Sequence, residues 1–307
     1  MRCNGGSSKG RTPHSGCGNW GSSPCPPASL DYLDIGLSSH NYNIWLEFSC
    51  MEFIEYPEIN SFLNTALDEM KVILGDNLVG LYLYGSLVWG DFDENISDVD
   101  LLAVTKTPLN GSEFAQLEKL HNELVKSYKE LDNRVEIAYA HLAALKTFKI
   151  QKSEISVISP GEPFHKKEAG IDWLINWYIV LQQGKTLFGP DSDRVIEPIS
   201  KEEFVQAVQR QAKEWADWVI HTKGSRPYQG HAILTMCRAF YAQKHGEQVS
   251  KKQAALWAMI ELPEWTALIQ QALQWRRDFR NREVDNEATY PQTEKFVKYM
   301  AGRIAGF

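Results

Sequence analysis

The segment Leu81–Val104, LYLYGSLVWGDFDENISDVDLLAV, decides how this chain is organised. Its apolar run Leu81–Tyr84 predicts a buried strand, and Gly85-Ser86 predicts a turn that leads into a short helix. A second apolar run, Leu101–Val104, follows Ser97-Asp98-Val99-Asp100 and predicts a second strand. We therefore expect two strands linked by a small-residue turn and a pair of carboxylates.

The carboxylates of Asp98 and Asp100 are separated by one residue at the start of the second strand. A strand sends residues i and i+2 to the same face, so both side chains point into one space. Two negative charges that close repel each other unless a cation lies between them. Mg²⁺ prefers oxygen ligands and bound phosphates, so the pair predicts a magnesium site.

The turn Gly85-Ser86 has the properties of a phosphate-binding element. Glycine lets the backbone approach a phosphate without a Cβ atom in the way. Ser86 begins a helix, and the free N–H groups of a helix N-terminus favour anions. A phosphate-binding turn close to a magnesium site indicates nucleotidyl transfer.

The composition excludes several classes of protein. The 307 residues carry a net charge of −7, which argues against a surface that follows nucleic-acid phosphates and is compatible with a cationic small substrate. No apolar run approaches the roughly 20 residues that span a bilayer. Four of the five cysteines lie in the first fifty residues, so no disulfide framework is available to the body of the chain, and we expect a reducing cytoplasm.

The chain divides into three regions. Residues 1–50 are rich in Gly, Ser and Pro without apolar periodicity, which predicts a disordered or spurious N-terminal extension. Residues 51–155 hold the strand patterns, and residues 156–307 are dominated by helical patterns, in which Gly246 is expected to end one helix and Ser250 to cap the next. The polar stretch 145–170, with two prolines, is interpreted as the connection between the two domains.

A third carboxylate, Glu136, lies in another predicted strand. The segment Arg134–Ala140 alternates, which places Val135, Ile137 and Tyr139 on one face and Glu136 on the other. An isolated strand Glu is usually solvated charge, so its assignment depends on its neighbours.

The pattern Gly85-Ser86, a spacer and Ser97-Asp98-Val99-Asp100 resembles the nucleotidyltransferase superfamily. The resemblance implies an α/β (α+β) domain with a small mixed sheet. It also implies a third acid on the strand beside the Asp pair, which Glu136 supplies as general base and as a further metal ligand. Ser97 is expected to help Gly85 and Ser86 seat the phosphates of ATP, and two Mg²⁺ ions are expected.

The second half resembles the all-α C-terminal domain of the aminoglycoside adenylyltransferases that modify streptomycin and spectinomycin. In that family an Arg and a Lys of the helical domain reach the ATP phosphates, and Arg238 and Lys251 stand at the matching positions. The matching segments are Leu187–Pro190, Cys237–Tyr241, Gly246, Ser250-Lys251, Ala254-Ala255, Trp257–Met259 and Leu262-Pro263.

Substrate recognition follows the family pattern less closely. The family uses an aromatic platform and acidic residues to hold the cationic drug, and Trp215 and Trp218 are candidate platforms. At the position where the family pattern would place an acidic pair, this chain has Tyr228-Gln229. We assign these two residues to the substrate site, although neither is acidic. This departure weakens the case for streptomycin, unless Asp217 compensates.

The sequence therefore predicts a Mg²⁺-dependent, monomeric enzyme that transfers AMP from ATP to a hydroxyl of an aminoglycoside-like antibiotic. Asp98, Asp100 and Glu136 form its catalytic and metal site, and no nucleic acid or membrane is expected as a partner. One alternative is the same chemistry on a protein hydroxyl, a tRNA end or a metabolite. A second alternative is a catalytically silent binding module, which the three carboxylates argue against.

Overall fold

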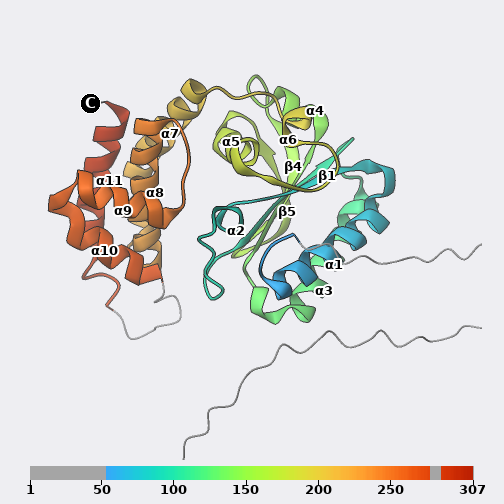
Figure 1. The fold of residues 1–307 in the computed structure, drawn as a ribbon, viewed down its shortest axis with the longest axis horizontal. Helices are drawn as coiled ribbons and strands as arrows, with labels where there is room; N and C mark the ends of the chain where they lie inside the picture. Colours follow the sequence, from blue (N-terminus) through green and yellow to red (C-terminus); the bar gives the residue numbers. More distant parts are fainter. Residues whose placement is uncertain (1–52, 277–284, 307) are drawn as a thin grey trace, which may run out of the picture. The chain divides into compact units, whose positions relative to one another are not determined.

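A computed structural model describes residues 53–276 and 285–306 and contains one six-stranded sheet followed by a helical region (Figure 1). The predicted extension, residues 1–50, lies outside the described residues. The strand order is β5-β4-β3-β2-β1-β6, with β2 and β3 parallel and every other neighbouring pair antiparallel. The strands are β1 (Leu78–Tyr84), β2 (Val99–Thr105), β3 (Val135–His141), β4 (Ser153–Ser159), β5 (Glu162–Ala169) and β6 (Lys185–Phe188). The predicted mixed sheet and helical second half are confirmed.

One face of the sheet is covered by α1 (Pro57–Leu74) and α3 (Gly111–Ser127). From Leu81 onwards, alternate residues of β1 and β2 are fully buried on this face: Leu81, Leu83, Val99, Leu101 and Ala103. Because side chains alternate along a strand, the even-numbered residues belong to the opposite face. That second face therefore carries the two aspartates and Glu136.

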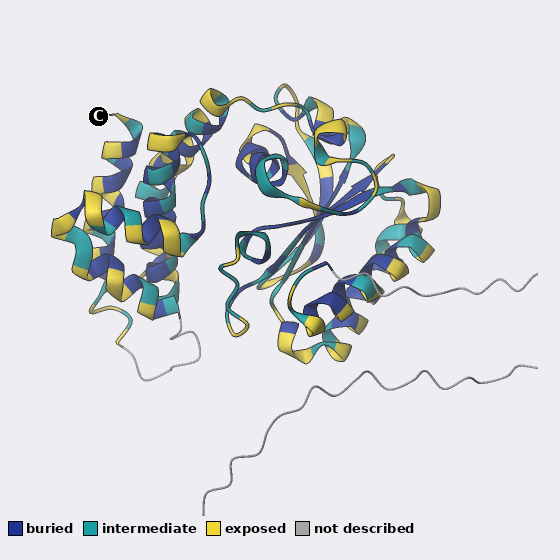
Figure 2. Cartoon of the chain, in the orientation of Figure 1, coloured by how far each residue is buried: buried dark blue, intermediate teal, exposed yellow. Residues whose placement is uncertain are grey.

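The second face packs against α5 (Leu174–Gln183) and is continuous with the core of the helical region. Leu102 and Ala138 are fully buried there, and Trp173 and Trp177 are buried with them. Figure 2 shows the buried strands in dark blue and the exposed outer turns of the helices in yellow. Apolar residues thus fill the middle of this face and leave the polar residues at the ends of β1, β2 and β3.

The helical region packs α7, α8, α9, α10 and α11 against one another. Gly246 ends α8 in the left-handed conformation, and Ser250 caps α9 by accepting a hydrogen bond from the Gln253 N–H (3.1 Å). Both predicted caps are therefore confirmed. The helices are α7 (Lys201–Trp218), α8 (Arg226–His245), α9 (Lys251–Glu261), α10 (Thr266–Trp275) and α11 (Tyr290–Ala305).

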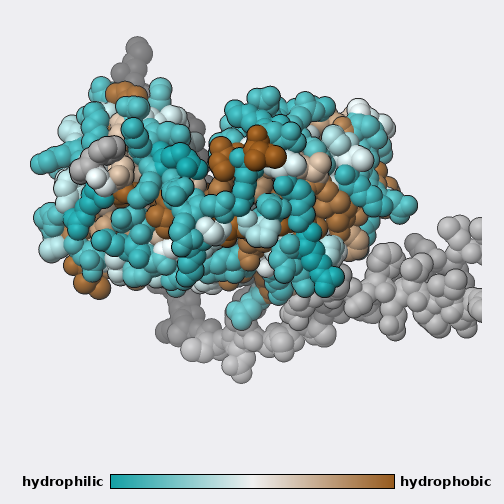
Figure 3. Space-filling view, turned by 90° about the horizontal axis from the view of Figure 1, so that it is seen from above, coloured by the Kyte–Doolittle hydropathy of each residue, from teal (hydrophilic) through white to brown (hydrophobic). Residues whose placement is uncertain are grey.

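Short helices complete the described chain. Those of the sheet region are α2 (Ser86–Trp89), α4 (Leu142–Thr147) and α6 (Ser192–Val195), with the 3₁₀ turns η1 (Gly75–Asn77), η2 (Lys129–Leu131) and η3 (Ile171–Trp173). The helical region adds η4 (Val219–Thr222) and η5 (Pro263–Trp265). None of the helices in residues 53–276 and 285–306 is both long and apolar enough to cross a membrane, and hydrophilic residues cover much of the face in Figure 3.

The interpretation of residues 145–170 as a connection between domains was wrong, because most of this stretch forms β4 and β5. The segment is polar because β5 is an edge strand, and five of its eight residues are exposed. An edge strand with charged side chains avoids pairing with other chains, so its sequence looks like a loop. The predicted boundary at 155/156 falls inside β4, and the sheet continues to Phe188.

Candidate active site

A cavity of about 710 Å³ is lined by residues from both the sheet and the helical region. Nine of the eleven residues assigned to the site from the sequence line it, although they come from positions 85 to 251 of the chain. They are Gly85, Ser86, Ser97, Asp98, Asp100, Glu136, Tyr228, Arg238 and Lys251. Trp218 and Gln229 are not among the lining residues.

Asp100 stands at the centre of a row of three residues that crosses β1, β2 and β3. It is the ladder partner of Tyr84 on one side and of Glu136 on the other, so the three side chains share one face of the sheet. Asp98 lies two residues before Asp100 and belongs to the same face. The predicted convergence of three carboxylates follows from this register.

The surroundings of these carboxyl groups disfavour their ionised form. Burial raises the pKa of Asp100 well above its ordinary value, and the neighbouring Glu136 and Asp98 raise it further. The pKa of Glu136 is raised mainly by burial and next by Asp98. Negative charges that oppose one another's ionisation create a site that a cation would stabilise.

The donor set fits Mg²⁺ as a carboxylate pair rather than as a complete protein cage. In the described part of the chain, no group of three or more His, Cys, Asp or Glu side chains is arranged to hold a metal ion. Magnesium usually takes one or two carboxylates and completes its shell with water and substrate phosphates. Asp98 and Asp100 supply the oxygen ligands that such a site needs.

A group of cations lines the same cavity from the helical region: Arg238 on α8, Lys251 at the start of α9 and Arg276 immediately after α10. Burial, followed by the nearby Arg238 and Arg276, lowers the pKa of Lys251 to about 7. Burial likewise lowers the pKa of Arg238 to about 10, and the nearby Asp100 opposes this shift. Cations that disfavour one another's charge form a site for a highly charged anion such as a triphosphate.

Arg276 was not identified from the sequence. It lies outside the short sequence segments that carry the resemblance to the family and in no recognisable motif, so no local signal marks it. It belongs to the cavity because helix packing places the end of α10 near α8 and α9.

His231 on α8 lies between the cations and an aromatic side chain. Its Nδ1 atom is 3.4 Å from the Lys251 Nζ atom, and its ring centroid is 5.9 Å from that of Trp215. Burial lowers its pKa well below the ordinary value, and the charges of Lys251, Arg238 and Arg276 lower it further. The imidazole is therefore neutral, and Nδ1 can accept a hydrogen bond from Lys251.

Arg134 fixes the loop that leads into the Asp pair. Its Nε atom donates to the Ser97 carbonyl oxygen (2.9 Å) and its Nη1 atom to the Glu94 carbonyl oxygen (2.6 Å). The Ser97 hydroxyl accepts a hydrogen bond from the Asp93 N–H (2.9 Å). Ser97 thus shapes the loop as well as lining the cavity.

The three residues assigned to substrate binding occupy different positions. Tyr228, at the start of α8, lines the cavity and is 54% exposed. Trp218, at the end of α7, is 48% exposed and packs edge-on against Trp215 outside the lining residues. The assignment of Trp218 stays a prediction without a contact to the cavity.

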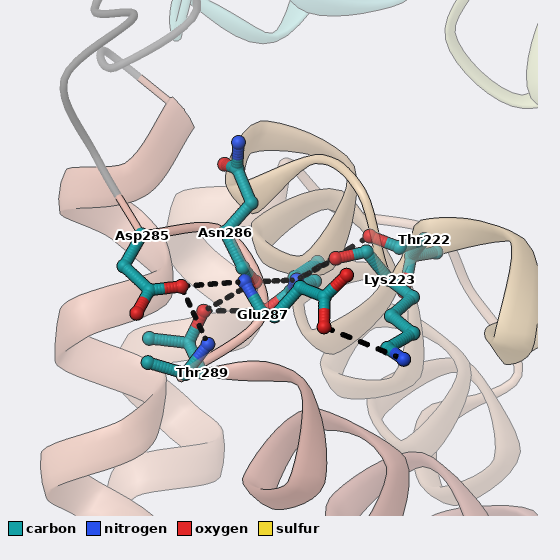
Figure 4. Close-up of polar contacts among 8 residues, drawn as sticks. Thr222, Lys223, Asp285, Asn286, Glu287 and Thr289 are labelled. Atoms are coloured by element: carbon teal, nitrogen blue, oxygen red, sulfur yellow. Dashed lines mark hydrogen bonds and ion pairs between the residues drawn. The ribbon is translucent and has the colours of Figure 1, made fainter.

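The assignment of Gln229 to the substrate site was wrong, because its side chain is fully buried and serves the fold. Its Nε2 atom donates to the Asn286 carbonyl oxygen (2.7 Å), and its Oε1 atom accepts from the Thr289 hydroxyl (2.6 Å). Figure 4 shows the surrounding contacts, in which Lys223 also pairs with Glu287 (3.4 Å). Gln229 joins the start of α8 to the segment that leads into α11.

A mixed sheet with a glycine-serine turn, a carboxylate row and an opposing group of cations defines a nucleotidyltransferase. Residues 63–168 match the model of the nucleotidyltransferase domain. Residues 194–303 match the model of the aminoglycoside adenylyltransferase C-terminal domain. The chain therefore belongs to the aminoglycoside adenylyltransferase family of the nucleotidyltransferase superfamily.

Relatives of known activity agree with this assignment. The chain is 28% identical over 273 aligned positions to spectinomycin 9-adenylyltransferase of Staphylococcus aureus strain Mu50, and to that of strain N315, covering 78% of this chain and 94% of each relative. In fold it is similar to the crystal structure of spectinomycin adenyltransferase AAD(9) from Enterococcus faecialis with ATP and spectinomycin. That similarity has a TM-score of 0.63 at 18% identity and covers 80% of this chain and 98% of the other.

Proposed function

We propose that the protein transfers AMP from Mg²⁺-bound ATP to a hydroxyl of spectinomycin and thereby confers resistance to this antibiotic. The observation that carries the proposal is that one cavity is lined by two opposing sets of groups. The Asp98, Asp100 and Glu136 carboxylates line it from the sheet, and the cations line it from the helical region. Transfer of a nucleotidyl group requires both, because a general base and a cation must serve the reacting centre while positive groups hold the phosphates.

Glu136 is the general base in this proposal. The acceptor hydroxyl oxygen attacks the α-phosphorus of ATP, the bond to pyrophosphate breaks, and the hydroxyl proton passes to the Glu136 carboxylate. Its raised pKa favours the role, because a base works best when its pKa approaches the working pH. The proton then remains on Glu136, and the negative charge of the leaving group remains on pyrophosphate.

The cations hold the triphosphate. Arg238 and Lys251, with Arg276 beside them, stabilise the charge that develops on the departing pyrophosphate. Gly85 and the N–H groups at the start of α2 seat the phosphates on the sheet side. Mg²⁺, held by Asp98 and Asp100, would neutralise the triphosphate and align the leaving group; the presence of two ions is our prediction.

The acceptor is proposed to be spectinomycin rather than streptomycin for two reasons. The relatives that align over most of this chain are spectinomycin 9-adenylyltransferases, which points to the 9-hydroxyl as the acceptor group. Tyr228, the aromatic residue that lines the cavity at the start of α8, stands where the family is expected to carry an acid for the more cationic drug.

The test is a direct assay of product formation. The purified full chain is incubated with ATP, Mg²⁺ and, separately, spectinomycin, streptomycin or kanamycin, and mass spectrometry identifies the drug that gains one AMP unit. We expect an adduct of spectinomycin alone, with fragmentation locating the AMP at the 9-hydroxyl. Asp100→Asn should form no product, and Glu168→Gln, an exposed position on β5, should behave as wild type. Adenylylation of streptomycin alone, or of none of the drugs, would overturn the proposal.

A further inference from the structure

Tyr84 carries a buried hydroxyl that the proposed mechanism does not use. The side chain is the last of β1, directly before the Gly85-Ser86 turn, and the residue is 6% exposed. Its Oη atom is buried and has no hydrogen-bond partner among the residues that the structure describes. A buried hydroxyl without a partner destabilises the fold, so proteins rarely keep one without a reason.

Tyr82 shows how the same strand treats a structural tyrosine. It lies two residues earlier on the same face of β1 and is fully buried, but its hydroxyl donates to the Pro190 carbonyl oxygen (2.7 Å). The sheet can therefore satisfy a buried phenol where the hydroxyl serves the fold. Tyr84 differs from Tyr82 in that it lines the active-site cavity.

The surroundings of Tyr84 define what its hydroxyl can bind. It is the ladder partner of Asp100, which is in turn the partner of Glu136. Burial raises the pKa of Tyr84 well above its ordinary value, and the Glu136 and Asp100 charges raise it further. A tyrosine hydroxyl is already protonated near neutral pH at its ordinary pKa of about 10, so Tyr84 presents an O–H donor.

The phosphate-binding turn is adjacent to this donor along the chain. Gly85 and Ser86 follow Tyr84 directly and line the same cavity, as do the cations that face the triphosphate. From this position we infer that the Tyr84 hydroxyl donates a hydrogen bond to a phosphate oxygen of the bound nucleotide. The inference rests on the proposed function, because it requires that the cavity binds ATP.

The test compares Tyr84→Phe with the matched variant Tyr82→Phe. Equilibrium dialysis measures the binding of Mg²⁺-ATP and of adenosine, which lacks phosphates, to each full-length protein, and thermal unfolding reports stability. A hydrogen bond to a charged acceptor is typically worth enough to weaken ATP binding about tenfold or more in Tyr84→Phe. Adenosine binding should be unchanged, and the Tm should stay the same or rise because an unpartnered hydroxyl has been removed.

Tyr82→Phe should behave in the opposite way. It leaves the Pro190 carbonyl oxygen without its donor, so the Tm should fall while ATP binding is unchanged. If Tyr84→Phe binds Mg²⁺-ATP as wild type does, or loses affinity for adenosine and ATP equally, the assignment to a phosphate oxygen is overturned. Failure of the wild-type protein itself to bind ATP would instead refute the proposed function.

Discussion

The Oδ2 atom of Asp100 lies 2.1 Å from the position that a Cβ atom on Gly85 would occupy. The carboxylate of β2 therefore rests directly on the backbone of the turn after β1, and only glycine leaves space for it. Gly85 also has φ +78° and ψ −148°, a conformation that is almost exclusive to glycine. The proposed phosphate-binding turn and the proposed metal-binding carboxylate therefore both depend on Gly85, for steric and for conformational reasons.

Gly85→Ala is expected to abolish AMP transfer and to destabilise the protein. The backbone conformation alone costs about 1 to 3 kcal/mol for an alanine, and displacement of the Asp100 carboxylate adds to this cost. A displacement of about 1 Å at a reacting centre can lower the rate about a hundredfold. Denaturant unfolding and the transfer assay measure the two effects.

Gly90→Ala is the matched control, because Gly90 also has a positive φ (+69°) but a Cβ atom there would meet nothing within 4 Å. It should lose about 1 to 2 kcal/mol of stability and retain most of its activity. Equal losses of activity in the two variants would show that the conformational strain, and not the contact with Asp100, matters for the reaction.

Asp100→Asn is expected to stabilise the fold while removing activity. The pKa of Asp100 is raised in the folded state, so its ionisation opposes folding at every pH above the pKa of an unfolded aspartate, about 3.9. Asparagine removes this penalty and should raise the free energy of unfolding by about 1 kcal/mol at pH 7. Catalytic sites often carry such a cost because their charges serve the reaction.

The pH dependence provides the check on this prediction. Near pH 4 Asp100 is protonated in the folded protein, so the difference in stability between wild type and Asp100→Asn should shrink towards zero. Urea unfolding at pH 4, 5.5 and 7 measures that difference. A variant that is less stable than wild type at pH 7 would indicate that the carboxylate is already satisfied by its surroundings.

The position of the carboxylate row could be predicted because it depends on local patterns. Asp98 and Asp100 share a face by strand alternation, and Glu136 joins them because β2 and β3 are parallel neighbours with Asp100 opposite Glu136. The turn at Gly85 could likewise be predicted, because the dipeptide Gly85-Ser86 alone indicates it. Each of these features requires only the geometry of one strand or one pair of strands.

The residues that were missed or misassigned depend on tertiary packing. Tyr228 and Gln229 are neighbours at the start of α8, and the contacts with residues 222–223 and 286–293 decide that Gln229 is the buried one. Arg276 lines the cavity because of how the helices pack, and no local sequence motif predicts that packing. The strand β5 was missed because an exposed edge strand has the composition of a loop.

Binding of ATP is expected to weaken as the pH rises through about 7, because that is the pKa of Lys251 in the protein without ligand. The charged form of lysine exists below its pKa, and only this form can pair with phosphate. Lys251 faces the cations Arg238 and Arg276 and the neutral His231, whereas Asp98 and Asp100 favour its charge. The KM for Mg²⁺-ATP should therefore rise on the alkaline side.

Lys251→Arg tests the origin of this effect, since a guanidinium keeps its charge across the whole range. We expect a weaker but nearly pH-independent KM for ATP in this variant. Lys252→Arg, at the exposed neighbouring position, should keep the wild-type profile. If the Lys251→Arg profile has the same slope as wild type, another group titrates.

Substitutions of Tyr228 and Gln229 should affect different properties: the first substrate binding, the second stability. Tyr228→Ala removes an exposed aromatic side chain from the cavity wall, and the loss of its contact with the drug should raise the KM for spectinomycin about threefold to tenfold. The KM for ATP and the Tm should change little. Steady-state kinetics with each substrate varied in turn provide the measurement.

Gln229→Ala should have the reverse profile, because it leaves the Asn286 carbonyl oxygen and the hydroxyls of Thr289 and Thr293 without their shared partner. Each buried polar group that loses its hydrogen bond costs about 1 to 3 kcal/mol, so the variant should unfold at a clearly lower urea concentration. Below that transition its KM for spectinomycin should equal the wild-type value. An increase in that KM without a change in stability would return Gln229 to the substrate site and contradict its role in joining α8 to the segment before α11.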